Sequence, residues 1–95
     1  QLKNKETFFN DEPVAVRIEA CHKIPKSTSK KKAEEMKRGL IFPTKKPDVD
    51  NIAKVICDAL NGVAWHDDTQ VVSLEVNKFY TDGEEKVVVH IMRYR

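Results

Sequence analysis

The chain has 95 residues, of which 40% are hydrophobic and 34% are charged, and its formal net charge is +2. These values predict one small globular domain with a modest core, for which oligomerisation would add stability, and they exclude a disordered chain. No apolar run reaches the roughly 20 residues of a membrane helix. Cys21 and Cys57 form no C-x-x-C pair, so we expect a reduced, cytoplasmic protein without a disulfide or a structural zinc.

The charges are unevenly distributed along the chain. Between Lys23 and Lys46 there are nine basic and two acidic residues, giving +7, whereas residues 47–95 carry five basic and nine acidic residues, giving −4. A basic segment beside an acidic one suits an enzyme that holds a polyanion in one place and cations in another. Taken alone, the basic run is more typical of a solvated loop and helix.

The first half of the chain predicts one strand and one polar helix. Apolar and polar residues alternate from Pro13 to Lys23, which indicates a half-buried strand. A short helix follows, ends at Gly39, and has Ser27, Thr28 or Ser29 as its candidate cap. This helix is polar almost all round, so we expect it to be exposed.

The second half predicts an amphipathic helix and two strands. From Asp50 to about Leu60 the apolar residues form a helical stripe, and Asn61-Gly62 ends the helix. Two strands follow, and Asp82-Gly83 between them is a typical hairpin turn. The predicted fold class is therefore α+β, with a small mixed sheet and helices packed on one face.

Four acids surround the second helix. Asp48 or Asp50 is placed to cap its start, and side chains at these two positions can converge there because the chain changes from extended to helical between them. Asp67 and Asp68 follow the helix, and we expect the next strand to bring one of them back to the same end. Clustered carboxylates repel one another unless a cation lies between them, and Mg²⁺ prefers such oxygen ligands.

Ordinary structural roles compete with this metal-site interpretation. Lys54 lies one helical turn after Asp50 and one before Asp58, so it is either an ion-pair partner or a group that contacts a phosphate. Any one of the acids is better explained as a helix cap or as part of a polar turn. Taken together, the acids and the neighbouring lysine make a metal site and an ordinary structural role about equally good explanations.

The stretch "KPDVDNIAKVICDALNGVAWHDDTQVVSLEVNKFY" closely resembles the RusA-type Holliday junction resolvases, with their Asp-x-Asp-Asn-x-x-Lys-x-x-x-Asp-Ala-Leu motif and a later Asp-Asp-x-Gln-Val segment. The preceding "IPKSTSKKKAEEMKRG" is similar to members from Gram-positive bacteria and their prophages. The resemblance covers about Val14 to Ile91. It implies a RusA-like fold over residues 1–95 and a homodimeric, Mg²⁺- or Mn²⁺-dependent endonuclease that cuts four-way DNA junctions by paired nicks in recombination and repair.

The resemblance also implies roles for individual residues. The catalytic acids of the family fall on Asp48, Asp50 and Asp68, and its essential lysine falls on Lys54. Asp67 is expected near the metal. Asp58 is expected to orient Lys54 or to cap the network of charged groups. The family usually opens with a further strand and a basic loop, and nothing before Pro13 matches them, so the domain is expected to be N-terminally incomplete.

Contacts to DNA are expected from lysines beside the acids. Lys45 and Lys46 directly precede Asp48 and are the favoured phosphate contacts, which raise affinity without reading sequence. Lys30, Lys31 and Lys32 are the second choice, for which a solvated helix is an equally good explanation.

Two further expectations complete the sequence analysis. Trp65 could stack on a base, although packing is the more common role of a lone tryptophan after a helix. The alternative to an endonuclease is a non-cleaving module that binds branched DNA through its basic segment, with structural acids.

Overall fold

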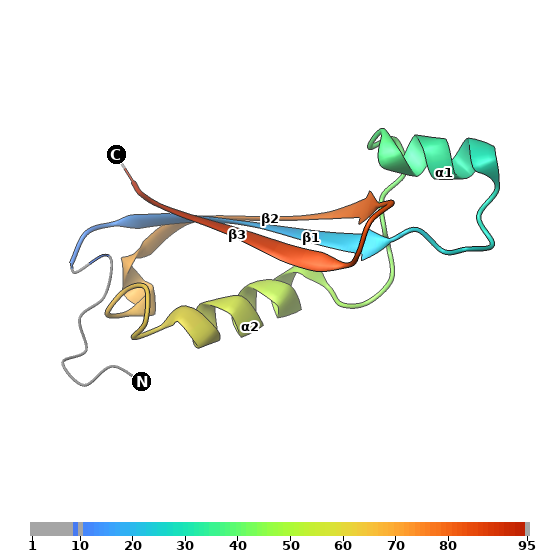
Figure 1. Ribbon diagram of the computed structural model, residues 1–95. Coiled ribbons are helices and arrows are strands. Elements are labelled where there is room, and N and C mark those ends of the chain that lie inside the picture. The colour runs from blue at the N-terminus through green and yellow to red at the C-terminus, as the bar shows by residue number, and fades with distance from the viewer. Residues whose placement is uncertain (1–8, 10, 95) are drawn as a thin grey trace.

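The computed structural model describes Phe9 and residues 11–94. Its elements follow the order β1 (Val14–Lys23), α1 (Lys30–Lys37), α2 (Val49–Leu60), a short 3-10 helix η1 (Asp68–Gln70), β2 (Val71–Thr81) and β3 (Lys86–Arg93) (Figure 1). The three strands form one mixed sheet. The predicted α+β class is therefore confirmed. Within the described part of the chain, no helix has the length and apolar character needed to cross a membrane.

β1 is the central strand of the sheet. It pairs in parallel with β2 on one side and antiparallel with β3 on the other. The predicted hairpin between β2 and β3 is therefore wrong, because β1 lies between these two strands. Residues 82–85 instead cross the end of β1, where the Lys23 backbone N–H donates to the Glu85 carboxylate at 3.4 Å. Four residues can span the roughly 10 Å across two strand spacings.

The core lies between β1 and α2. The alternation predicted for β1 is confirmed, because Val14, Val16, Ile18 and Ala20 are all buried on one face of the sheet. Ile52 of α2 is buried in the same cluster, and α2 lies along this face (Figure 1). The helix therefore docks lengthwise against the sheet through its predicted apolar stripe.

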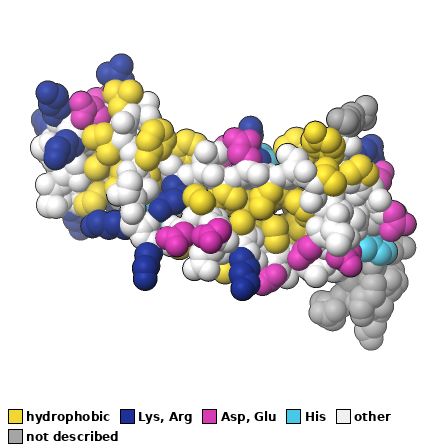
Figure 2. Space-filling view, turned by 180° about the vertical axis from the view of Figure 1, so that it is seen from behind, with side chains coloured by type: hydrophobic (Ala, Val, Ile, Leu, Met, Phe, Trp, Pro, Cys, Tyr) yellow, Lys and Arg dark blue, Asp and Glu magenta, His cyan; other side chains and the backbone are white. Residues whose placement is uncertain are grey.

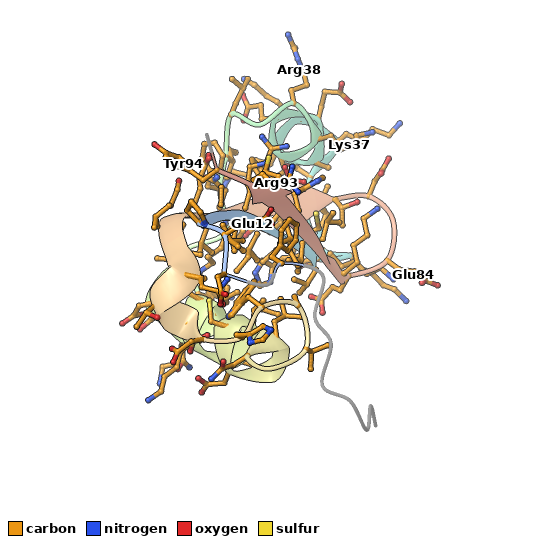
Figure 3. The ribbon with its side chains drawn as sticks, turned by 90° about the vertical axis from the view of Figure 1, so that its left-hand side faces the viewer. Glu12, Lys37, Arg38, Glu84, Arg93 and Tyr94 are labelled. Carbon is orange, nitrogen blue, oxygen red and sulfur yellow. The ribbon has the colours of Figure 1, made fainter. Side chains whose placement is uncertain are left out.

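α1 lies on the other side of the sheet. Its cap is Ser29, whose hydroxyl accepts from the Lys32 backbone N–H at 3.3 Å, and Gly39 follows the helix with a φ of 77°. No residue of α1 is buried. Figure 3 shows α1 above the sheet and α2 below it, with Lys37 and Arg38 extending from α1. Only α2 covers the core face, whereas α1 contacts the sheet near the end of β2.

The two ends of the described chain meet at the start of β1. Arg93 forms an ion pair with Glu12 at 3.0 Å, and the Tyr94 backbone N–H donates to the Pro13 carbonyl at 2.9 Å (Figure 3). These contacts hold the end of β3 beside the entry to β1. The predicted absence of a first strand and basic loop concerns the segment before Pro13, most of which lies outside the described residues.

We predict that Ile18→Ala destabilises the domain strongly. Ile18 is fully buried at the centre of β1, so the truncation removes apolar burial and leaves a cavity that costs about 2–5 kcal/mol. Val72→Ala, at a residue that is largely exposed on β2, should cost less than about 1 kcal/mol. Urea unfolding of both variants measures the difference, and equal losses would contradict the assignment of the core face.

Candidate active site

Asp48 and Asp50 stand together at the start of α2. They line one surface hollow of about 330 Å³ with Lys46, Pro47 and Asn51. The two residues therefore border the same hollow at the helix start. Asp48 occupies the N-cap position with extended backbone, and its carbonyl accepts from the Ile52 N–H at 3.0 Å.

The carboxylate of Asp48 does not cap the helix. It makes no capping hydrogen bond, and neither Asp48 nor Asp50 forms an ion pair with another described residue. The backbone N–H groups and the positive end of the helix dipole favour anions at this position. Two carboxylates at one helix start still repel each other. The pair is therefore well placed to share a cation, and a capping role does not account for Asp48.

Lys54 stands one turn further along α2 and is exposed. Within the described part of the chain, no ion pair joins its ammonium to Asp50 or to Asp58. The ion-pair explanation of Lys54 is therefore not realised, and its charge stays available to a ligand. The predicted contact by which Asp58 would orient Lys54 is likewise not observed.

Asp67 and Asp68 lie in a hydrogen-bonded turn beyond the other end of α2. Trp65 is fully buried, which confirms its packing role, and its indole N–H donates to the Asp68 Oδ1 at 2.9 Å. The Asp67 carboxylate accepts from the Thr69 N–H at 3.1 Å. Gln70 completes the capping box by accepting from the Asp67 N–H at 3.0 Å. Both acids are thus fixed in place by the turn.

One chain does not bring Asp68 to Asp48 and Asp50. α2 has 12 residues, so its ends are about 18 Å apart. The turn after it is closed locally, with the Gly62 N–H donating to the Trp65 carbonyl at 2.7 Å, and β2 starts from that end (Figure 1). The expectation that the chain returns Asp67 or Asp68 to the start of the helix is not met. In the described residues, no three His, Cys, Asp or Glu side chains form a group that could hold a metal.

Lys45 and Lys46 adjoin the acids. Both line a second hollow of about 180 Å³, whose other walls are His22, Lys23, Pro25, Pro43, Tyr80 and Glu85. Lys46 also lines the hollow of Asp48 and Asp50. The Lys45 carbonyl accepts from the Lys78 ammonium, which holds this segment against β2. The structure therefore brings a basic hollow and an acidic hollow side by side.

Lys30, Lys31 and Lys32 lie elsewhere. They belong to exposed α1, on the opposite side of the sheet from α2. Figure 2 shows that Lys and Arg side chains gather over the end of the molecule that carries α1. In Figure 1, α1 projects beyond the end of the sheet, above it, whereas α2 lies below the sheet.

Sequence reasoning missed two residues that build the site. Gln70 caps η1 and also donates to the Glu12 carbonyl at 2.9 Å, so it ties the Asp67-Asp68 turn to the entry of β1. The spacing from Asp67 to Gln70 is a capping-box signature that could have indicated this role. Lys78 has no such signal, because its contact to Lys45 spans 33 positions.

Comparison with known proteins places this sequence in a family. Residues 1–92 match the family model described as Endodeoxyribonuclease RusA. The chain belongs to the RusA endodeoxyribonuclease family. This agrees with the resemblance drawn from the motif between Asp48 and Asp68.

A bacterial relative is similar to this chain over most of its length. The chain is 48% identical over 81 residues to the uncharacterized protein YqaN of Bacillus subtilis (strain 168), a match that covers 83% of this chain and 56% of YqaN. The chain thus spans about half the length of this relative. No solved structure matches the chain.

The pKa of the Cys57 thiol depends on the nearby carboxylate of Asp68. Burial raises the pKa of Cys57, and the negative charges of Asp68 and Asp58 raise this pKa further. A carboxylate near the sulfur disfavours the thiolate, which is the form that reacts with iodoacetamide. We therefore predict that Asp68→Asn lowers the pKa of Cys57 and speeds its alkylation at pH 8.

Mass spectrometry of the Cys57 peptide during alkylation measures this rate. Asparagine can still accept the Trp65 hydrogen bond, so the turn should keep its shape. Glu84→Gln, in the turn between β2 and β3, is the matched control and should leave the rate unchanged. An unchanged rate in Asp68→Asn would show that Asp68 does not lie beside this end of α2.

Proposed function

We propose that the protein is a metal-dependent endonuclease that resolves four-way DNA junctions by paired nicks in recombination and repair. The observation that carries the proposal is the pair Asp48 and Asp50, which share one hollow at a helix start where the Asp48 carboxylate makes no capping hydrogen bond. Membership of the RusA endodeoxyribonuclease family gives this pair a chemical purpose. Branched DNA is the proposed substrate, and a homodimer is the proposed active form.

The residues at the start of α2 fit a hard divalent cation. Mg²⁺ is commonly held by one or two carboxylates, with waters and substrate phosphates as its remaining ligands. Asp48 and Asp50 supply two such carboxylates, so they are the proposed ligands for Mg²⁺ or Mn²⁺. Asp68 and Asp67 remain proposed ligands as well, but those of the same chain lie at the far end of α2.

The proposed mechanism divides the work among neighbouring side chains. Asp48 and Asp50 would hold the cation, which when bound supplies an activated water and stabilises the leaving oxygen of a phosphodiester. Lys45 and Lys46 hold the DNA backbone beside these acids. Lys54, which is exposed and without an ion pair to either neighbouring acid, offsets negative charge that develops on the phosphate.

We predict that Asp50→Asn abolishes cleavage but preserves DNA binding. The amide keeps the size of the side chain and removes the charge that attracts the cation, so nicking of a labelled four-way junction should fall by about 100-fold or more. The assay compares Mg²⁺, Mn²⁺ and EDTA, with linear duplex as the substrate control. Glu84→Gln is the protein control and should cut like the wild type.

Two outcomes would count against this assignment. If Asp50→Asn cuts at the wild-type rate, Asp50 is not a metal ligand. If the wild type binds the junction tightly but cuts it in neither metal, the protein is better described as the non-cleaving junction-binding module.

We predict that the double variant Lys45→Ala/Lys46→Ala binds DNA more weakly and with less dependence on salt. Each lost phosphate contact should reduce the slope of log K against log[salt] by about 0.9. Fluorescence anisotropy with a labelled junction at several KCl concentrations measures this slope. Lys30→Ala/Lys31→Ala on α1 removes the same charge and should change the slope less. A larger effect of the α1 pair would move the DNA contact to the other side of the sheet.

A further inference from the structure

We infer that Phe42 is a stacking platform for a base at the branch point of DNA, supported by Phe79 and flanked by basic residues that contact the backbone. This inference deepens the proposed function and rests on it for the identity of the substrate as branched DNA. Phe42 belongs to an exposed apolar segment that neither the core nor the acidic hollow uses.

The segment "KRGLIFPTKK", from Lys37 to Lys46, places three consecutive apolar residues between two pairs of basic ones. It contains no acidic residue. Proteins that bind unpaired nucleic acid combine a basic surface, which follows the backbone, with aromatic side chains on which bases stack. The segment therefore brings both kinds of contact together within a short stretch of chain.

The fold holds this segment in place at both ends. At its start, the Gly39 N–H donates to the Met36 carbonyl at 3.2 Å, and the Leu40 N–H donates to the Glu35 carbonyl at 2.9 Å. These two bonds form the Schellman motif that closes α1. Towards its end, Pro43 is buried and lines the basic hollow. The course of the chain between these two points is therefore constrained.

The aromatic side chain of this constrained stretch stays outside. Phe42 is 52% exposed and Leu40 is 63% exposed, whereas Ile41 between them is half-buried. Figure 2 shows hydrophobic side chains among the Lys and Arg side chains at the end of the molecule that carries α1. An exposed ring within a positively charged surface suits a partner that carries both flat apolar rings and negative charge, as nucleic acid does.

Phe79 of β2 supports the ring of Phe42. The two ring centroids are 6.3 Å apart and the ring planes are tilted by 52°, a geometry that aromatic pairs favour. Phe79 pairs in register with Cys21 of β1, so it lies on the face of the sheet opposite to the core. One side of the Phe42 ring is thus held by the sheet, and a base that stacks on the open side finds the ring already oriented.

The platform lies close to the proposed phosphate contacts. Lys45 is three residues after Phe42, so their Cα atoms are at most about 11 Å apart. Pro43 and Lys45 both line the basic hollow, and the Lys78 ammonium donates to the Lys45 carbonyl, which fixes this part of the segment to β2. A strand whose phosphate lies in the basic hollow can therefore place a nearby base on Phe42.

Stacking on Phe42 would favour branched DNA over linear DNA. In a linear duplex both faces of an internal base pair are covered by its neighbours, so an inserted side chain must first separate two stacked pairs. The base pairs that meet at an open branch point lack a neighbour on one side, and Phe42 can cover that free face. Phosphate contacts alone give no such preference, because the backbone carries the same groups in both substrates.

Replacing the ring tests stacking separately from charge. Phe42→Leu keeps an apolar side chain but removes the aromatic face, so binding to a labelled four-way junction should weaken by about 5-fold or more. Phe42→Trp should bind at least as tightly as the wild type. The slope of log K against log[salt] should stay the same in both variants, because no phosphate contact is lost. Fluorescence anisotropy in EDTA at several KCl concentrations measures affinity and slope, and binding to linear duplex should change less.

Tyr94→Leu is the matched control. Tyr94 is an aromatic residue of similar exposure, at 49%, and it ends the described chain far from α1 (Figure 1). Its replacement should leave binding unchanged, and urea unfolding checks that Phe42→Leu remains folded. Wild-type affinity of a folded Phe42→Leu, or an equal loss for junction and duplex, would overturn the inference. Reduced self-association of Phe42→Leu with unchanged DNA binding would also overturn it, because the ring would then contact a second protein chain.

Photochemical cross-linking locates the base directly and without cleavage. 5-Iodouracil replaces one thymine beside the branch point, the complex is irradiated in EDTA, and mass spectrometry should find the DNA attached at Phe42. The same analogue placed well inside an arm should give no such product. Cross-linking at Phe42 by a protein that cuts the junction in neither Mg²⁺ nor Mn²⁺ would uphold the platform and refute the nuclease function. Cutting without this cross-link would uphold the function and refute the platform.

Discussion

The fixed length of α2, docked on the central strand, is the constraint on which the arrangement of charged groups depends. Its apolar stripe buries Ile52 against Val14, Val16 and Ile18 of β1, and this burial holds the helix along the sheet. The two ends of the helix then carry different groups. The start carries two carboxylates in a region that favours anions, and the end leads into a turn fixed by a buried tryptophan.

The turn after α2 couples Asp68 to the core. Trp65 contributes a large buried surface, and its N–H must find an acceptor because an unsatisfied buried donor costs about 1–3 kcal/mol. Asp68 supplies that acceptor at 2.9 Å. Gln70 adds bonds from the same turn to the entry of β1. The carboxylate is therefore positioned by the interactions that stabilise the fold.

The sequence predicted the elements better than their arrangement. Alternation in β1 and the apolar stripe of α2 are local patterns, so they indicated the strand, the helix and the position of Asp48 and Asp50 at the helix start. Strand order depends on which strand buries the most apolar surface. The Asp82-Gly83 turn signal does not reveal that a third strand lies between the two strands that the turn connects. Likewise, the spacing from Asp50 to Asp68 does not reveal that the intervening helix runs straight to the far end of the sheet.

The neighbouring hollows explain why the chain concentrates opposite charges in adjacent segments. Lys46 lines both the acidic and the basic hollow, so in the proposed function a phosphate held by the lysines would lie beside a cation held by the acids. Each ligand reduces the repulsion that the other would meet, because the cation offsets the phosphate charge and the phosphate offsets the cation. Binding of the cation and of the DNA backbone should therefore be mutually reinforcing. The small net charge of +2 thus combines a basic and an acidic segment, and Lys46 is the residue at which their two hollows meet.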